Sequence, residues 1–596
     1  MFLKKYLTRL VKPFIIFLMS KRILSVLSLF FAILFLNNIC FAANPPASQQ
    51  MSGEVRATQM QQQEENLRKE AEKPKEKGII EEETPKEATP QEPAGQKILI
   101  KSINVIGVTL FADNKIKAIT SQYENKELNL KEIQKIADLI TDLYRQKGYI
   151  TSRAYIAPQK MEEGNLEISV MEATVGDIQI KGNRFYSTAI IKKYISLKKG
   201  DIFNYNFLKE DLVRVNEHPD RNAKAVLAPG KEPGSTDIVL DVKDSFPLHV
   251  GLGYNNFLSR FLRRNNYNST FTDNNLFGQD DILTIQYQRG DANDYYSYNA
   301  RYLYPVTKSL DIGIFASHSK LVLGKEYTDA MSRGKSRMFS IYGSQKLIKN
   351  DNLTLNLNFG FDYKDVYNFL LGDISSQDRL RIAKAGFDFN LADDFGRTII
   401  SNDFNYGFPS IMGGTKAHLD PGDKPTSRTG AGGEFLKDTL NIVRLQKLLF
   451  DSTLLWKNQL QFSPSILTAT EQFQVGGPAN NRGYPPAEFV GDRGYSMVWE
   501  VAMPPYFMPK SLKVPFSKSR IYDAVRFIGF YDLANVHLKS LQAGDKKNRT
   551  ITSAGCGIRV NILENFFARY EIGWPLDQRP SDGKGVHQWI EITKTF

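Results

Sequence analysis

One short stretch restricts the fold more than any other: NLTLNLNFGFDY, residues 352–363. Its odd-numbered positions are Leu, Phe or Tyr, and its even-numbered positions are Asn, Thr, Gly or Asp. A strand sends successive side chains to opposite faces, so one face of this segment is apolar and the other strongly polar. From residue 246 onward, about sixteen segments follow this alternation and helical periodicity is absent. The second part of the chain is therefore expected to be all-β.

Two kinds of all-β structure can carry this alternation. A water-soluble sandwich buries its apolar faces in a core, whereas an outer-membrane barrel turns them toward lipid and its polar faces toward the lumen. Aromatic residues gather near strand ends, as in ANDYYSYNARYLY (292–304) and EIGWP (571–575), which fits aromatic girdles, and the chain ends on Phe596, a common last residue of such barrels. We therefore expect a transmembrane antiparallel barrel of sixteen strands, whose even strand number places both ends on the periplasmic side.

The N-terminus has the pattern of an export signal. Six basic residues precede an apolar run from Ile23 to Leu36, and small residues follow at Ala42 and Ala43. This order predicts a secretory signal peptide over 1–42, with Met19 as an alternative start and an inner-membrane anchor as the alternative interpretation. Its removal takes away six basic and no acidic residues, lowering the formal net charge from +12 to +6. Much of the basic charge therefore serves targeting and does not indicate nucleic-acid binding.

Cysteine usage agrees with a bacterial envelope. After removal of the signal only Cys556 remains, so the mature chain forms no internal disulfide. On its segment Cys556 shares a face with Ala554, Ile558 and Val560, and it is expected to meet lipid as a small hydrophobe.

Residues 43–96 have a biased composition. The stretch 54–72 contains strong helix formers, no Gly or Pro and few apolar residues, which predicts a helix suited to water or to a polar cavity. Residues 73–96, with repeated Pro, Glu and Lys, predict an extended charged linker. The alternative is that all of 43–96 is a disordered tail.

Two α+β modules of similar size come next. The first contains the amphipathic helix LNLKEIQKIADLITDLYRQKG (128–148), in which Ile133, Ile136 and Ile140 share one face. The second begins with the strand VGDIQIKGN (175–183). Both are expected to follow strand–helix–helix–strand–strand order, with helices on one face of an open-edged sheet.

Five motifs in order carry a family resemblance. They are LYRQKGYITSRAYIAPQ (143–159), AKAVLAPGKEPGSTDIVLDV (223–242), GGPANNRGY (476–484), GDRGYSMVWE (491–500) and FYDLA (530–534). Together they resemble the transporters of two-partner secretion, the TpsB family, which includes the filamentous haemagglutinin and haemolysin transporters. The family belongs to the superfamily of the barrel-assembly protein BamA. The resemblance covers essentially the whole mature chain.

The resemblance implies an organisation that agrees with the segments above. The expected parts are a signal peptide (1–42), a plug-like N-terminal helix (43–72), a Pro/Glu/Lys linker (73–96), POTRA 1 (97–173), POTRA 2 (174–245) and a sixteen-stranded outer-membrane β-barrel (246–596). A polar lumen would accept the polar helix at 54–72, which a hydrophobic groove would not.

The function implied by the resemblance is export of a large β-rich partner exoprotein from the periplasm to the surface of a Gram-negative cell. The implied partners are this exoprotein, outer-membrane lipid, and the barrel assembly machinery and periplasmic chaperones during biogenesis, with no nucleic acid. A BamA-like factor that assembles other barrels is the alternative. A passive porin would leave residues 97–245 unexplained.

The sequence shows no set of residues typical of a catalytic site, and no cofactor or metal site is expected. The sequence contains no GxxxxGK[ST] phosphate loop and no HExxH, and its six His residues lack metal-ligand spacing.

The loop motif supplies the candidate site. In the family, the arginine of the long sixth extracellular loop reaches into the barrel and pairs with the aspartate of an F-x-D-x-G strand motif. Arg482 and Asp532 occupy these positions, with Phe530 as the first residue of the strand motif, and alternation directs Asp532 to the lumen. The strand count places this loop between the eleventh and twelfth strands, on the extracellular side. Two departures from the motif are Asn481, where many relatives have Val, and Ala534, where the motif ends in Gly; Ala534 could crowd the loop tip.

For the remaining residues, both a functional role and a simpler structural role are considered. Gly483 is expected to permit positive φ and close approach to the wall, and Tyr484 to direct a hydroxyl into the wet lumen. Arg482 could instead be an ordinary solvated arginine. Glu500 is expected to belong to a structural charge ladder on the lumen face, and Phe596 to be an assembly signal or merely the last lipid-facing side chain.

Overall fold

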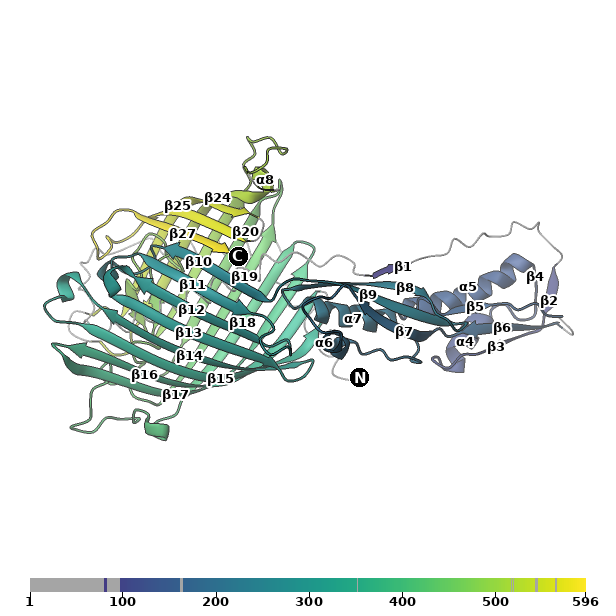
Figure 1. Cartoon of the computed structure of the whole chain (residues 1–596), viewed down its shortest axis with the longest axis horizontal. Helices are drawn as coiled ribbons and strands as arrows, with labels where there is room; N and C mark the ends of the chain where they lie inside the picture. Colours follow the sequence, from purple (N-terminus) through teal and green to yellow (C-terminus); the bar gives the residue numbers. More distant parts are fainter. Residues whose placement is uncertain are drawn as a thin grey trace. The chain divides into compact units, whose positions relative to one another are not determined.

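The structure is a computed structural model, and it describes residues 80–82, 97–160, 164–350, 352–515, 517, 519–541, 545–562 and 565–596 (Figure 1). The predicted signal peptide and plug-like helix lie outside the described residues, as does the linker apart from residues 80–82. No helix of the described chain is long and apolar enough to cross a membrane.

A closed antiparallel barrel of sixteen strands forms the larger part of the described chain, with strands that follow the chain order around the barrel (Figure 1). The strands are β10 (Leu248–Asn255), β11 (Asn266–Asp273), β12 (Ile282–Gly290), β13 (Tyr295–Pro305), β14 (Leu310–Val322), β15 (Arg333–Lys349), β16 (Leu353–Leu370), β17 (Asp373–Asp393), β18 (Gly396–Gly407), β19 (Phe435–Lys447), β20 (Thr453–Phe462), β23 (Arg493–Met503), β24 (Val525–His537), β25 (Asn548–Ile562), β26 (Phe566–Pro575) and β27 (His587–Thr595). Short helical turns lie in its loops at η2 (Arg260–Leu262), η3 (Asp291–Asn293), η4 (Lys325–Tyr327), η5 (Ile411–Gly413) and α8 (Ile521–Ala524).

The barrel closes through its first and last strands. β10 pairs with β27 from Gly251 opposite Thr595 onward, and the backbone N–H of Phe596 donates to the Val250 carbonyl at 2.8 Å. Closure leaves the sheet without a free edge, which is the requirement for a β structure in lipid.

The side chains of β16 show the inversion expected of a membrane barrel. Phe359 on its outer face is 49% exposed, whereas Asp362 and Lys364 on the lumen face are each 4% exposed. The apolar face of residues 352–363 therefore faces outward and the polar face inward, and the predicted sixteen-stranded barrel is confirmed.

Module 1 (residues 97–173) has two helices and two small sheets. Its elements are β2 (Ile98–Ile100), β3 (Ser102–Ile106), α4 (Asp113–Thr120), β4 (Lys126–Leu128), α5 (Leu130–Gln146), β5 (Arg153–Tyr155) and β6 (Asn165–Met171). The main sheet has the order β3-β6-β5, so β5 lies at one edge. α5 begins with a capping box between Asn129 and Glu132, and its buried face packs on the sheet.

Module 2 (residues 174–245) has the expected strand–helix–helix–strand–strand order. Its elements are β7 (Thr174–Lys181), α6 (Thr188–Tyr194), α7 (Tyr205–Asn216), β8 (Arg221–Pro229) and β9 (Ser235–Asp244). The sheet has the order β1-β8-β9-β7, in which β1 (Ile80–Glu82) comes from the predicted linker and pairs in parallel with β8. The sequence predicted an open sheet edge here, but a segment of the chain itself covers β8, because an extended linker can satisfy the free backbone groups of an edge strand.

Chain connectivity orients the barrel. β9 ends at Asp244 and β10 begins at Leu248, so β10 starts at the end of the barrel where module 2 is attached. Loops that follow the first, third and every further odd barrel strand therefore lie at the opposite end, which is called the far end below. The loop between β20 and β23, the eleventh and twelfth barrel strands, is one of these.

Candidate functional site

The longest connection at the far end, residues 463–492, is called L6 here. Its middle part forms a short hairpin of β21 (Phe473–Val475) and β22 (Phe489–Gly491), with the stretch GGPANNRGYPP between the two strands. Every residue from 480 to 488 is buried. A polar, Gly- and Pro-rich loop would ordinarily lie in water, so this burial shows that the tip of L6 folds into the barrel.

A compact turn shapes the tip. Gly476 and Gly477 have φ values of 105° and 92°, a region that glycine enters without steric cost. The backbone N–H of Gly477 donates to the Tyr484 carbonyl at 2.9 Å, and that of Asn481 donates back to Gly477 at 3.1 Å. The Asn481 side chain, at one of the two departures from the family motif, donates to the Ile551 carbonyl of β25 at 3.0 Å.

The turn directs Arg482 onto the barrel wall. Its Nη2 lies 2.7 Å from Oδ1 of Asp532, its Nε lies 3.0 Å from Oδ2, and its backbone N–H donates to the same Oδ2 at 2.9 Å. Arg482 is 4% exposed and Asp532 is fully buried. The fork of the guanidinium thus engages both carboxylate oxygens, the strongest arrangement for an ion pair of this kind.

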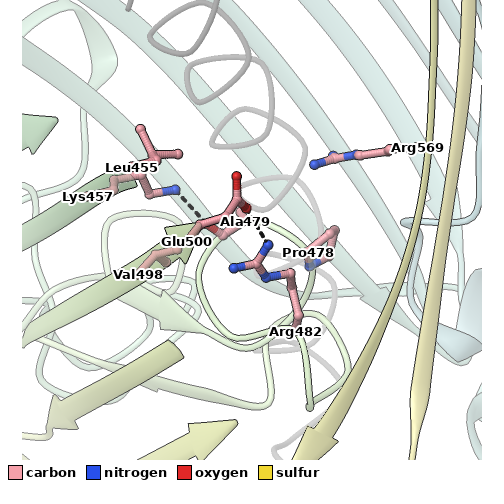
Figure 2. A pocket seen from close by; sticks show the side chains of 8 residues that line it. All are labelled: Leu455, Lys457, Pro478, Ala479, Arg482, Val498, Glu500 and Arg569. Atoms are coloured by element: carbon pink, nitrogen blue, oxygen red, sulfur yellow. Dashed lines mark hydrogen bonds and ion pairs between the residues drawn. The ribbon is translucent and has the colours of Figure 1, made fainter. Parts of the chain in front are cut away.

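Two further acids complete the surroundings of Arg482. Its Nη1 lies 2.8 Å from Oε2 of Glu500 on β23 (Figure 2). The same Nη1 lies 3.4 Å from Oε2 of Glu571 on β26. Arg559 of β25 bonds both of these glutamates. The network therefore holds three carboxylates and two guanidiniums, all buried, and each charged group is paired with at least one of opposite sign. Among these side chains, the buried Nε of Arg559 has no hydrogen-bond partner.

Contacts beside the ion pairs fix the position of the tip. The guanidinium of Arg482 lies 3.4 Å from the centre of the Phe530 ring, and the indole N–H of Trp589 donates to the Arg482 carbonyl at 2.8 Å. Figure 2 also shows Lys457, whose ammonium donates to the Ala479 carbonyl at 2.5 Å. Charged, aromatic and backbone groups thus act together on this one turn.

Gly483 is required for space. A Cβ on this residue would lie 2.5 Å from the Ser553 Cβ and 2.8 Å from the Pro575 backbone nitrogen, closer than real Cβ atoms come. Its φ is not positive, so this part of the expectation is wrong: the left-handed residues of the tip are Gly476 and Gly477. Close approach to the wall alone explains the glycine.

Tyr484 belongs to a small buried apolar cluster. Its ring packs with side chains that include Phe473, Ala534 and Ile551, and its hydroxyl donates to the Gln578 carbonyl at 3.0 Å. The hydroxyl therefore bonds the backbone of the β26–β27 loop and does not point into open lumen. Ala534 is accommodated within this cluster.

A second charged cluster engages residues 463–475, the part of L6 that leads to the tip and is called the arm here. Glu471 accepts from the ammonium of Lys364 on β16 at 2.8 Å and from that of Lys437 on β19. All three side chains are at least 95% buried. At the far end, Arg428 of the β18–β19 loop pairs with Asp492 at the base of L6.

Sequence reasoning missed part of this arrangement. It placed Glu500 in a structural ladder, whereas Glu500 bonds Arg482 directly, and it did not single out Glu571, Arg559 or Glu471. The alternation that places Cys556 and Ile558 on the outer face also turns Arg559 inward, so the face of this residue could have been predicted. Cys556 is exposed on the outer surface.

Among the residues that the structure describes, no cluster of three or more His, Cys, Asp or Glu is arranged to hold a metal ion. The chemistry of the site is that of ion pairing and hydrogen bonding between a loop and a wall.

Models of three known protein families and domains match this chain. A model of the family described as haemolysin secretion/activation protein ShlB/FhaC/HecB matches residues 234–525. A POTRA domain model of the ShlB type matches residues 98–173, and a further POTRA model, described as surface antigen variable number repeat, matches 173–243. The three matches run without a break from the first module into the barrel. The chain belongs to the two-partner secretion transporters.

Individual members of this transporter family resemble the chain along most of its length. The heme/hemopexin transporter protein HuxB of Haemophilus influenzae is 22% identical over 85% of this chain and 89% of its own. The outer membrane transporter CdiB of Escherichia coli is 22% identical over 71% and 72%. The solved structure of CdiB from Escherichia coli superposes with a TM-score of 0.69 at 19% identity, covering 93% of this chain and all of that one, and that of CdiB from Acinetobacter baumannii with 0.63 at 16%.

Family membership identifies the compartment that each end of the barrel faces. The POTRA modules of these transporters are periplasmic and the barrel lies in the outer membrane. The far end of the barrel is therefore extracellular, and L6 is an extracellular loop that turns back into the lumen.

Proposed function

We propose that this protein recognises a large, β-rich exoprotein in the periplasm and exports it through its barrel to the cell surface. The observation that carries the proposal is a closed sixteen-stranded barrel preceded by two POTRA modules. Two POTRA models and one secretion-transporter model match residues 98–525 of this chain without a gap. Relatives along most of the chain carry the names of transporters. The role is passage of a polypeptide, not catalysis of a reaction.

Module 1 offers the better edge for recognition of the exported chain. In the sheet order β3-β6-β5, the edge strand β5 has no further strand beside it in the described part of the module, and Tyr155 on it is 44% exposed. An extended segment could add to such an edge through main-chain hydrogen bonds, with alternate side chains contacting the neighbouring α5. In module 2 the corresponding strand β8 is already paired with β1.

L6 supports a role in passage through the barrel. Arg482 connects the loop to three wall strands, since Asp532, Glu500 and Glu571 lie on β24, β23 and β26. We propose that this connection positions L6 for export and that the variants Arg482→Ala and Asp532→Ala reduce secretion while barrel levels persist.

The energy for export must come from a source other than nucleotide, because the periplasm holds none and the sequence lacks a phosphate loop. We propose that folding of the exoprotein outside the cell prevents its return. An exoprotein engineered not to fold outside should be released poorly, and undiminished release would contradict this source of energy.

Biogenesis of the barrel is proposed to require the barrel assembly machinery and periplasmic chaperones. Phe596 lies at the seam, where its backbone pairs with Val250 and its side chain is 68% exposed. Such a side chain is accessible to an assembly factor before the barrel closes. Phe596→Ala should lower the amount of folded barrel in the outer membrane without changing the activity per folded molecule.

A deletion strain tests the main proposal. The proteins of the culture medium and the outer membrane are compared by mass spectrometry between wild type and deletion. Loss of one large exoprotein, restored by a plasmid copy of the transporter, is the expected result. A broad fall in other outer-membrane barrels with exoproteins unchanged would instead favour a BamA-like assembly factor. A neighbouring gene for a very large, repeat-rich exoprotein would identify the first candidate cargo.

A further inference from the structure

The outer face of strands β14 to β17 changes character abruptly along its length. One row of directly paired residues, Ile314, Ile341, Phe361 and Ala383, is apolar. Ile314 and Ile341 are 44% and 51% exposed, as expected for side chains that meet acyl chains. Toward the extracellular end the same outer face becomes cationic.

Four residues make up what is called the cationic belt here: Lys320 on β14, Lys335 and Arg337 on β15, and Arg379 on β17. Lys320 lies directly opposite Lys335, and Arg337 and Arg379 flank Asp365 of β16 from either side. Lys320 and Arg337 are exposed, and Lys335 and Arg379 are partly exposed. Like charges directly opposite across a pair of strands destabilise it unless an anion lies between them.

The protein supplies little negative charge to this surface. Asp365 lies in the row, but its carboxylate bonds Nη1 of Arg381 at 2.9 Å. Arg381 also lies over the Tyr363 ring. Asp365 is thus engaged by this buried arginine, which is not a member of the belt. Within the described ranges no ion pair involves a member of the belt. The belt thus carries more positive charge than Asp365, the one acid of its row, can offset.

The belt is a local feature of one side of the barrel. At the extracellular end of β23, β24 and β25, the corresponding outward row is Tyr495, Asn535 and Thr550, which are uncharged. Arg493 of the next row stacks on Phe462 and donates to the Ser463 carbonyl. A general need for solubility at the membrane surface would place charges around the whole rim. The excess of basic residues on β14 to β17, with the exposed Arg289 two strands away on β12, indicates a specific anionic partner.

The position of the belt defines the kind of partner. Tyr296 and Tyr298 of β13 lie opposite Lys320 and His318, at the level where an aromatic girdle marks the membrane boundary. Below the belt come a row of Ala316, Phe339, Tyr363 and the buried Arg381 and then the apolar row that faces acyl chains. A partner must therefore carry anionic groups at headgroup level and hydrocarbon beneath them, which describes a phosphorylated amphiphile better than a soluble acidic protein.

We propose that the cationic belt binds the phosphate groups of lipopolysaccharide in the outer leaflet, with the acyl chains of the lipid lying on the apolar row below. Arginine engages phosphate oxygens with a planar fork, and lysine neutralises them as a mobile point charge. Basic residues near a membrane surface each strengthen binding of anionic lipid appreciably. One lipid phosphate group placed among Lys320, Lys335 and Arg337 would also relieve their mutual repulsion.

Binding of purified lipopolysaccharide to the full-length protein in phosphatidylcholine nanodiscs tests the proposal. The variant Lys320→Gln/Lys335→Gln/Arg337→Gln should bind at least about tenfold more weakly than wild type. The control Lys117→Gln/Lys510→Gln/Lys513→Gln removes the same charge from exposed periplasmic positions and should bind as wild type does. The conservative variant Lys320→Arg/Lys335→Arg should retain binding.

Two further probes separate the possible sources of phosphate. Enzymatically dephosphorylated lipopolysaccharide should bind the wild type at least about tenfold more weakly than the intact lipid, and inorganic pyrophosphate should not compete at equal concentration. Unchanged affinity in the triple variant, an equal loss in the control, or indifference to dephosphorylation would overturn the proposal. Pyrophosphate that binds as tightly as the lipid would assign the belt to a free anion instead.

Folding of each variant is verified by the heat-dependent shift of barrel mobility in gels. If the triple variant does not fold, the single change Lys335→Gln replaces it, with an expected loss of several-fold.

Discussion

The tip and the arm of L6 are both buried in the barrel by charges, but they are bound in different ways. The tip places one arginine among three carboxylates on β23, β24 and β26 and adds a ring contact and backbone hydrogen bonds. The arm places one glutamate between two lysines on β16 and β19. Arginine is a rigid fork, whereas lysine is a point charge on a flexible stem.

This difference suggests that the tip and the arm of L6 have different roles. The contacts of the tip depend on one another, because Asp532 bonds both the side chain and the backbone of Arg482. The ion pairs of the arm join the ends of long side chains, which can separate and re-form, while its backbone also bonds the side chains of Ser427 and Gln461. We therefore expect the tip to be the fixed joint of L6 and the arm to be the part that is released when the lumen opens.

Removal of the acid at the tip should have the largest effect. In Asp532→Ala, Arg482 loses its bidentate partner and the acceptor of its backbone N–H but keeps Glu500 and Glu571, and the loss of such charged hydrogen bonds costs about 1.5–3 kcal/mol each. Secretion of the exoprotein, measured by immunoblot of the medium, should fall strongly while folded barrel persists. Asp403→Ala, which removes a lumen-side aspartate of β18, is the control and should secrete normally.

A methyl group at the tip should have a smaller but clear effect. In Gly483→Ala the added Cβ meets Ser553 and the backbone at Pro575, so the turn must move away from the wall. Secretion should drop severalfold. Gly529→Ala on β24 is the matched control, because a Cβ there has no atom within 4 Å. Equal secretion by the two variants would show that the tip tolerates displacement.

Release of the arm should change the ion permeability of the pore more than the export of the exoprotein. Glu471→Gln leaves Lys364 and Lys437 without their shared carboxylate while the tip contacts remain. We expect higher ion conductance in planar bilayers and greater sensitivity of cells to vancomycin, with most of the secretion retained. A loss of secretion as large as that of Asp532→Ala would remove the distinction between arm and tip.

The smallest effect on stability is expected at Glu488, which follows the tip of L6 in the chain. Burial raises the pKa of Glu488 from its usual value near 4.5 to about 7, although Ser581 donates to its carboxylate through N–H and hydroxyl. A carboxyl group with a raised folded-state pKa loses stability as the pH rises through the interval from 4.5 to 7. Glu488→Gln should therefore be more heat-stable than wild type at pH about 8.5, by roughly 1–3 kcal/mol, and equal to it at pH about 4. A constant difference at both pH values would assign the effect to packing.

Much of this architecture follows from local patterns in the sequence. Alternation separates the lumen face from the lipid face, which is why Asp532 and Glu500 could be placed in the lumen and Cys556 outside. The same alternation cannot give the height of a residue along the barrel axis, because height depends on the stagger between strands. Glu571 and Arg559 are 89 and 77 residues from Arg482, and only the register of β25 and β26 brings them to its level.

Pairings between distant segments also lay beyond the sequence. β1 adds to module 2 through backbone groups that any extended segment possesses, so no residue pattern marks the pairing. Glu471 looks like an ordinary loop acid, and its partners Lys364 and Lys437 are ordinary lumen-facing lysines of strands far from L6 in the sequence. The family resemblance pointed to the tip of L6 because that contact has a motif, and the arm has none.

Secretion by Arg482→Ala shows whether export requires L6 to be joined to the wall, since this single change removes the side chain that joins L6 to three wall strands. Exoprotein in the medium is measured together with the amount of folded transporter in the outer membrane. The account predicts strongly reduced exoprotein per folded transporter, with Arg482→Lys intermediate because lysine cannot form the bidentate pair. Wild-type secretion by Arg482→Ala at a normal level of folded barrel would contradict it.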